Sequence, residues 1–373
     1  MMSIVILIIV ILVILSIFLY FFVLEDKKSV QDFLQKFRKH KEQLVEKKST
    51  IDVSVFQKGL SEVHFHNELL KKVKTELHKK IVWMDNFINS VIVNLLCGWH
   101  ILVEGFPWLA KTKTIHTFAD IMGMAFKRIQ FTPDMLPSDI IGVEIYNTAT
   151  KEFETKMGPI VANIILADEI NRSTPKVQSA LLEAMQEQQV TIGGKTVKLP
   201  EPFLILATQN PLEQEWTYPL PEAQIDRFLF KILVDYPTLL DEKKVMDTVE
   251  HEEKIHVEKV VSNHDFDEVK KEMEKVTMSD EVKEYITRLV QKTREKNPDI
   301  LYGSSPRWSI GLMVAAKALA FVEGKEYATH EDVQKVALSV LRHRIVLSYD
   351  AKISWLTEDG VLLDLFAEVK LSS

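Results

Sequence analysis

The sequence contains one cysteine, few glycines and no excess of positive charge. Cys97 has no cysteine to pair with, and it lies in the apolar run 91–97, where a small core residue is expected rather than a nucleophile. Lys and Arg number 46 against 53 Asp and Glu, so the net charge of -7 gives no overall attraction to nucleic acid. The 11 histidines, including His64 and His66, show no metal-ligand pattern. We expect a protein of a reducing compartment without a nucleic-acid partner.

Residues 4–24 carry no charge and consist almost entirely of Ile, Leu, Val and Phe. A helix of this length spans roughly the 30 Å hydrocarbon core of a bilayer. A secretory signal would have a basic start, a shorter apolar region and a cleavage site of small residues, and this segment has none of them. We therefore predict a single-pass transmembrane helix over 1–24. Positive charges follow the helix and none precedes it, so the positive-inside rule places the rest of the chain in the cytoplasm. These charges are Lys27, Lys28, Lys36, Arg38, Lys39 and Lys41.

The pattern then changes twice along the chain. Helical spacing of apolar residues predicts a helical linker over 25–75, and short β-like runs alternate with helical stretches from about residue 95. This alternation indicates an α/β domain with a mostly parallel sheet, over 76–235. After Pro237 no convincing strand is visible, and a helical domain is expected over 236–373. Thr329 and Asp332 resemble a capping box at the start of one of its helices. The expected strands are 101–103, 126–130, 164–167, 203–207 and 228–234.

Residues 105–113 predict a phosphate-binding loop. They lie between a β-like run and a helical segment, where backbone N–H groups and one ammonium group can surround phosphate oxygens. Lys111 would pair with the β- and γ-phosphates of ATP, and the Thr112 hydroxyl would ligate Mg²⁺. The expected nucleotide-binding residues are Gly105, Phe106, Pro107, Trp108, Leu109, Ala110, Lys111, Thr112 and Lys113, together with Asp168 downstream.

Asp168 and Glu169 follow an apolar strand, as expected of a metal-binding and a water-orienting carboxylate. Asn210 follows another core strand, where its neutral amide could sense the γ-phosphate. Arg227 and Arg307 lie at element boundaries. Each arginine could be a surface ion pair, or it could reach a γ-phosphate and stabilise the transition state. The predicted catalytic residues are thus Glu169, Asn210, Arg227 and Arg307, with Thr112 and Asp168 as metal ligands.

Five segments together resemble the MoxR-type AAA+ ATPases: 131–139 (FTPDMLPSD), 166–172 (LADEINR), 207–211 (ATQNP), 218–224 (YPLPEAQ) and 305–307 (SPR). The resemblance covers about residues 75–360. It implies an αβα nucleotide domain, a helical lid and a ring, typically a hexamer, in which a neighbour completes each site. It assigns Asn210 as the first sensor, Arg307 as the lid sensor and Arg227 as the finger acting on the next subunit. It further implies chaperone-like work on protein clients, often with von Willebrand A-type partners. A transmembrane anchor is not typical of the family.

The six tryptophans stand where this family has or accepts glycine, and the chain has only 12 glycines. In the phosphate loop, position 108 needs close backbone approach and tolerance of positive φ, which an indole does not supply. One hypothesis explains both facts: the host reads UGA as glycine. The positions concerned are Trp83, Trp99, Trp108, Trp216, Trp308 and Trp355.

The sequence therefore predicts a membrane-anchored ATPase that uses ATP and Mg²⁺ to remodel a protein client. If Trp108 is genuine, a tethered scaffold that does not hydrolyse ATP is the alternative. A DNA-remodelling motor is disfavoured by the acidic balance and by the lack of a recognisable DNA-binding module.

Overall fold

The structure, a computed structural model, describes residues 53–61, 63–105, 110–210, 217–249 and 255–370. The chain from Asp52 onwards forms one compact unit. Within the described ranges, no helix has the length and apolar character needed to cross a bilayer. The predicted transmembrane helix, 1–24, lies outside these ranges, as does the predicted linker up to residue 52.

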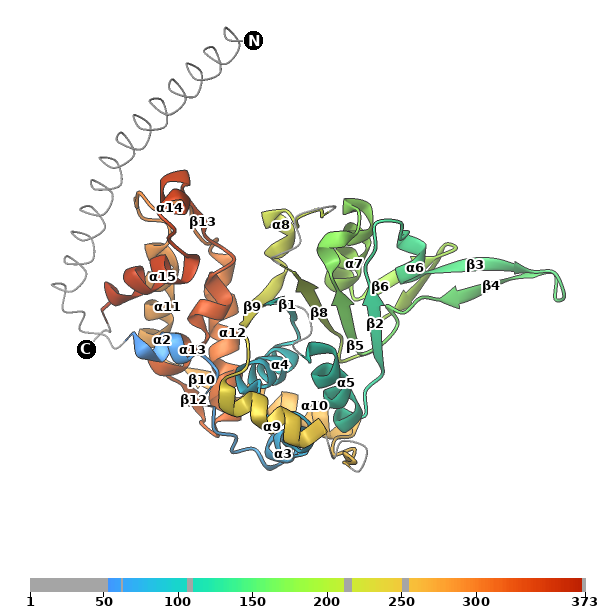
Figure 1. The fold of residues 1–373 in the computed structure, drawn as a ribbon, viewed down its shortest axis with the longest axis horizontal. Coiled ribbons are helices and arrows are strands. Elements are labelled where there is room, and N and C mark those ends of the chain that lie inside the picture. The colour runs from blue at the N-terminus through green and yellow to red at the C-terminus, as the bar shows by residue number, and fades with distance from the viewer. Residues whose placement is uncertain (1–52, 62, 106–109, 211–216, 250–254, 371–373) are drawn as a thin grey trace, which may run out of the picture. The chain divides into compact units, whose positions relative to one another are not determined.

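Five parallel strands form the central sheet in the order β2-β5-β8-β1-β9 (Figure 1). The predicted parallel sheet is confirmed, and each expected run lies in or overlaps one of its strands. Because parallel strands run the same way, the ends of β1, β2, β5 and β8 reach one edge of the sheet. The strands are β1 (His100–Gly105), β2 (Phe126–Gln130), β5 (Ile164–Asp168), β8 (Leu204–Gln209) and β9 (Phe228–Val234).

Helices cover both faces of this sheet. Side chains alternate between the faces along each strand. On one face, Ile165 and Ile205 share a buried cluster with Leu181 of α7 (Pro175–Glu187). On the other side, α4 (Asp85–Cys97) packs on β1 and β9, and α5 (Lys111–Met122) packs on β2 and β5. The result is the αβα core that the sequence predicts.

Two antiparallel hairpins accompany the core, and the sequence reading did not anticipate either. The longer one, β3 (Gly142–Asn147) with β4 (Glu152–Met157), follows the short α6 (Pro137–Ile141) and projects away from the sheet (Figure 1). The shorter one joins β6 (Gln189–Ile192) to β7 (Lys195–Lys198). Its turn residues, Gly193 and Gly194, have φ of 56° and 80°, which suits the type I′ turn that glycine favours.

The C-terminal region is helical, as predicted, although it also contains two short strand pairs. One pair is β10 (Thr277–Met278) with β12 (Tyr327–Ala328), and the other is β11 (Ile300–Tyr302) with β13 (Val346–Leu347). The expectation of no strand beyond Pro237 was therefore wrong at these sites, because two or three residues carry no periodic signal. The helices are α9 (Leu239–Val249), α10 (Asn263–Glu274), α11 (Asp280–Lys292), α12 (Arg307–Val322), α13 (His330–Leu341), α14 (Tyr349–Ile353) and α15 (Glu358–Ala367).

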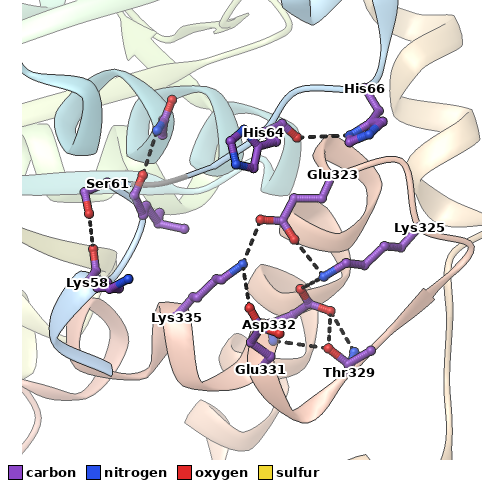
Figure 2. Close-up of polar contacts among 12 residues, drawn as sticks. Lys58, Ser61, His64, His66, Glu323, Lys325, Thr329, Glu331, Asp332 and Lys335 are labelled. Carbon is purple, nitrogen blue, oxygen red and sulfur yellow. Dashed lines mark hydrogen bonds and ion pairs between the residues drawn. The ribbon is translucent and has the colours of Figure 1, made fainter. Parts of the chain in front are cut away.

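Ion pairs fix the turn between α12 and α13 (Figure 2). Glu323 accepts Lys325 at 2.7 Å and Lys335 at 2.9 Å. Lys325 also pairs with Asp332 at 2.6 Å, and Asp332 accepts hydrogen bonds from the backbone N–H and the hydroxyl of Thr329. The predicted capping box at Thr329 and Asp332 is confirmed. The N-terminal helices α2 (Ser54–Lys58) and α3 (Glu68–Lys80) pack on α13 and α5, respectively.

Three consecutive residues that follow α13 bind the backbone of β9. Arg342 donates to the carbonyl of Lys231 at 3.3 Å, and Arg344 donates to that of Leu229 at 3.0 Å. Burial lowers the pKa of His343, so its neutral ring can donate through Nε2 to the Phe228 carbonyl at 3.0 Å. Arg344 also donates to this carbonyl. The helical C-terminal region is thereby tied to the edge strand of the sheet.

Candidate nucleotide site

A cavity of about 460 Å³ lies at the edge of the sheet where β1, β5 and β8 end. This is the place at which open parallel sheets bind ligands. Its lining combines lysines, carboxylates, hydroxyls and amides, which suits a charged ligand. The residues are Gly105, Ala110, Lys111, Thr112, Lys113, Arg128, Asp168, Glu169, Thr208, Gln209 and Asn210.

The loop between β1 and α5 supplies the basic side of this cavity. Ala110 has φ of 54°, and this left-handed turn leads directly into α5 at Lys111. The Lys111 ammonium donates to the carbonyl of Gly105 at 2.9 Å. Burial lowers the pKa of Lys111, and the negative charges of Asp168 and Glu169 oppose that effect. The predicted loop residues Phe106, Pro107, Trp108 and Leu109 lie outside the described residues.

Thr208 links the carboxylate of Asp168 to the backbone of Glu169 across neighbouring strands. Its hydroxyl donates to Asp168 Oδ1 at 2.6 Å and accepts the backbone N–H of Glu169 at 2.9 Å. Glu169 has φ of 58°, a left-handed conformation that costs a non-glycine residue free energy. Such strain is commonly found at functional sites, where the surrounding contacts maintain it. The backbone at Glu169 is therefore held in a specific and unfavourable conformation.

Further side chains, absent from the sequence prediction, hold the same carboxylates. Gln130, at the end of β2, donates to Glu169 Oε2 at 2.8 Å, and Arg172 Nε lies 3.3 Å from this oxygen. Arg128 donates to Asp168 Oδ2 through Nε at 3.1 Å and through Nη2 at 2.6 Å. The sequence predicted both β2 and β5 as strands of one parallel sheet. Polar residues near the end of β2 could therefore have been expected beside Asp168 and Glu169.

The donor set suits a small divalent cation. Mg²⁺ prefers hard oxygen ligands and few protein carboxylates. The Thr112 hydroxyl and the Asp168 carboxylate line one cavity with the amide of Asn210, which is 8% exposed. The predicted residues from 105 to 210 that the structure describes are thus brought together. Arg227 and Arg307 are not among the residues that line the cavity.

Comparisons with known proteins agree with this geometry. A profile of the ATPase family associated with various cellular activities matches residues 100–230, and an AAA lid domain profile matches 292–361. Chaperone MoxR1 of Mycobacterium tuberculosis is 44% identical over 302 residues, covering 78% of each chain. The chain belongs to the MoxR family of AAA+ ATPases. Protein YeaC of Bacillus subtilis is 44% identical over 81% of this chain and 95% of its own. A crystal structure from Cytophaga hutchinsonii has a TM-score of 0.77 and 45% identity, covering 82% of this chain and 95% of its own.

The two arginines assigned from the MoxR pattern have partners within the subunit. Arg227 donates through Nη1 to the carbonyl of Leu182 at 2.8 Å. The Arg307 guanidinium lies 5.3 Å from the ring centre of Trp99 and 5.8 Å from that of Trp308. Their roles as a finger and a lid sensor stay predictions.

Trp355 occupies a left-handed backbone position that is held by glycine where the same motif ends three other described helices. It follows α14 with φ of 57°, and its side chain region is open, the residue being 88% exposed. The N–H groups of Trp355 and Leu356 bond back to the carbonyls of Lys352 and Ala351, both at 3.1 Å. This pair of bonds is the Schellman motif. The same motif ends α4, α5 and α12, where the left-handed residue is Gly98, Gly123 or Gly324.

Trp308 is buried, and Trp83 is half-buried. Trp308 is fully buried, its ring N–H donates to Asp226, and the Arg344 guanidinium carbon lies 3.1 Å from its ring centre. The Arg344 guanidinium therefore lies over the face of the indole, the arrangement of a cation–π contact. Trp83 lines a cavity of about 30 Å³ beside Ala110 and Lys113. Trp108 and Trp216 lie outside the described residues.

Proposed function

We propose that this MoxR-family protein hydrolyses Mg²⁺-ATP in the cavity and uses the free energy to remodel a protein client. The supporting observation is the convergence of Lys111, Asp168, Glu169 and Asn210 on one cavity at the end of the sheet. Lys111 would bind phosphate oxygens, Glu169 would orient the attacking water, and Asn210 would contact the γ-phosphate. Thr112 and Asp168 would hold Mg²⁺, which when bound neutralises charge on the phosphate oxygens.

Measuring phosphate release tests this proposal. Glu169→Gln should bind ATP but lose hydrolysis by about 10²-fold or more, because the orienting carboxylate is gone while the phosphate contacts remain. Lys111→Ala should lose binding as well. Glu284→Gln, on the exposed surface of α11, is a matched control and should keep both. Equal hydrolysis by the Glu169→Gln variant and the parent protein would contradict the proposal.

The functional unit that we propose is a homo-oligomeric ring, typically a hexamer. Family resemblance supports it, with Arg227 contributing to the site of the neighbouring subunit and Arg307 acting from the lid. Mixing Arg227→Ala subunits with Glu169→Gln subunits tests it. Each variant alone should be inactive, and the mixture should recover hydrolysis because some interfaces then combine an intact Glu169 with an intact Arg227. No recovery from mixed rings would argue against a shared site.

The proposed location is the membrane, with the ATPase domain in the cytoplasm. The support is the uncharged segment 4–24 and the lysines and arginines that follow it. Protease added to intact cells should leave the ATPase domain whole, and protease added after lysis should cut it. Cleavage in intact cells would refute this topology. A client at the membrane, with a von Willebrand A-type protein as one candidate, fits this location; the M. tuberculosis relative is itself named a chaperone.

We further infer that the host inserts glycine at the six tryptophan positions. Support comes from the left-handed φ of Trp355 and from the low glycine content of the sequence. We call this version the glycine-decoded chain. Peptide masses of the protein isolated from its host should show glycine at position 108, and the six codons should be UGA. UGG at position 108 would end this inference and would favour a tethered scaffold that does not hydrolyse ATP.

A further inference from the structure

Arg128 is the one arginine that lines the nucleotide cavity among the described residues. It lies on β2, whose register with β5 places it opposite Leu166, two residues before Asp168. Its guanidinium reaches Asp168 Oδ2 through both Nε and Nη2, at 3.1 and 2.6 Å. Nη2 also donates to Gln130 Oε1 at 2.5 Å. The guanidinium is therefore oriented by two neighbouring acceptors.

These contacts leave Asp168 with both carboxylate oxygens engaged. Thr208 donates to Oδ1 at 2.6 Å, and Arg128 occupies Oδ2. A carboxylate oxygen that binds Mg²⁺ directly lies about 2.0–2.1 Å from the ion. A guanidinium on the same oxygen would repel the cation and compete for the oxygen's lone pairs. The Asp168 side chain is 17% exposed and that of Arg128 is 48% exposed, so Arg128 has the freedom to move into solvent.

We propose that Arg128 is a positioning residue that competes with the divalent cation for Asp168. It holds the carboxylate in place before nucleotide enters, and it gives up Oδ2 when the cation is bound. This inference rests on the proposed function, because it takes Asp168 as the metal ligand. Arg128 thus sets how strongly Mg²⁺ and ATP reinforce each other's binding.

The measurement is the affinity of the full-length glycine-decoded chain for a fluorescent ATP analogue, once in EDTA and once in saturating Mg²⁺. The affinity in Mg²⁺ divided by the affinity in EDTA reports the coupling between metal and nucleotide. In Arg128→Gln we expect this ratio to rise roughly fivefold, the upper end for a half-exposed ion pair. The affinity in EDTA should stay within about twofold of the parent. Arg128→Lys, which keeps the charge without the two-pronged contact, should give a smaller rise.

Two variants separate this effect from others. Arg172→Gln removes an equal charge with similar exposure, 42% against 48%, from a side chain that contacts Glu169 instead of Asp168. It should leave the ratio near that of the parent. In an Asp168→Asn background, Arg128→Gln should no longer change the ratio, because the shared carboxylate is gone. A merely structural role for Arg128 would not depend on Asp168 in this way.

The outcomes are distinct from those of the proposed function. If the parent glycine-decoded chain shows no Mg²⁺-enhanced binding of the analogue, the proposed function itself fails. If the parent shows Mg²⁺-enhanced binding and Arg128→Gln has the same ratio of affinities, Arg128 does not compete with the cation for Asp168. If the affinities in EDTA and in Mg²⁺ fall equally, Arg128 is a phosphate ligand and the inference is overturned. An equal rise in Arg172→Gln would also overturn it, because general charge would then be the cause.

Discussion

Thr208 donates a hydrogen bond of 2.6 Å to Asp168, although 40 residues separate the two in the chain. The same hydroxyl accepts the N–H of Glu169, so one side chain holds the carboxylate of Asp168 and the backbone of Glu169. We predict that Thr208→Val, which keeps the shape but removes the hydroxyl, lowers the hydrolysis rate roughly 10- to 100-fold. This corresponds to losing hydrogen bonds to a charged group, about 1.5–3 kcal/mol. The assay is phosphate release at saturating Mg²⁺-ATP.

Thr287→Val is the matched control for this prediction. Thr287 donates to the Lys283 carbonyl on the exposed side of α11, and its loss should change the rate less than twofold. Equal rates for Thr208→Val and the parent would show that the bridge does not support catalysis.

His100 should make the fold sensitive to acid. It is buried in β1, accepts the N–H of Ile205 through Nδ1 and donates through Nε2 to the carbonyl of Met185. Burial lowers its pKa to about 4. The unfolded chain takes up this proton near pH 6.5 and the folded chain does not, so the free energy of unfolding falls as pH drops from 6.5 to 4. The expected loss is about 3 kcal/mol at most.

Urea unfolding at pH 7.5, 6 and 4.5 measures this dependence. His100→Gln should be less stable at pH 7.5 but should show a shallower loss toward pH 4.5 than the parent. His256→Gln, which changes an exposed histidine, should follow the parent curve. Parallel curves for His100→Gln and the parent would contradict the prediction.

Trp355→Gly should stabilise the protein that carries tryptophan at all six positions. The left-handed conformation at this position costs a residue with a Cβ roughly 1–2 kcal/mol, and the greater chain entropy of glycine offsets part of the gain. We expect a net increase of about 0.5–1 kcal/mol in the free energy of unfolding. Trp355→Ala is the control, because it removes the exposed indole but keeps the Cβ. If glycine and alanine gave equal stability, the backbone conformation would not be the cause.

Arg344→Met should weaken the attachment of the lid. Arg344 is 1% exposed at its side chain, pairs with Asp226 at 3.3 Å, and donates to the carbonyls of β9. The substitution removes a buried ion pair and leaves the Leu229 carbonyl without its side-chain donor, which should cost about 2 kcal/mol or more in the free energy of unfolding. Arg288→Met removes an exposed pair with Glu284 and should cost less than about 0.5 kcal/mol. Urea unfolding compares the two, and equal effects would mean that the lid contact is dispensable.

The five central strands could be predicted from the sequence because their apolar runs are continuous and bounded by polar residues. The capping box could be predicted as well, because two residues three positions apart, Thr329 and Asp332, carry the whole signal. The β3–β4 hairpin was missed because exposed residues such as Phe153 and Tyr146 mix with charges on both strands, so no face has a clean alternation. The short lid strands were missed because their pairing joins residues far apart in the chain.

The site could be predicted only in part, because some of its residues belong to local motifs and others are brought in by strand pairing. Lys111 and Asp168 lie in local motifs, whereas the roles of Arg128 and Thr208 depend on the register between three strands. Arg128 is 40 residues from Asp168 and carries no motif of its own. The prediction instead favoured Arg227 and Arg307, which lie at element boundaries and match the MoxR pattern.

The attachment of the lid to β9 has a consequence for assembly. An edge strand presents unpaired carbonyl and amide groups that can recruit a strand from another molecule. Here the carbonyls of Phe228, Leu229 and Lys231 already receive donors from the lid. The lid therefore protects this border against intermolecular β-pairing, and truncating the chain before α13 would convert a shielded border into a template for aggregation.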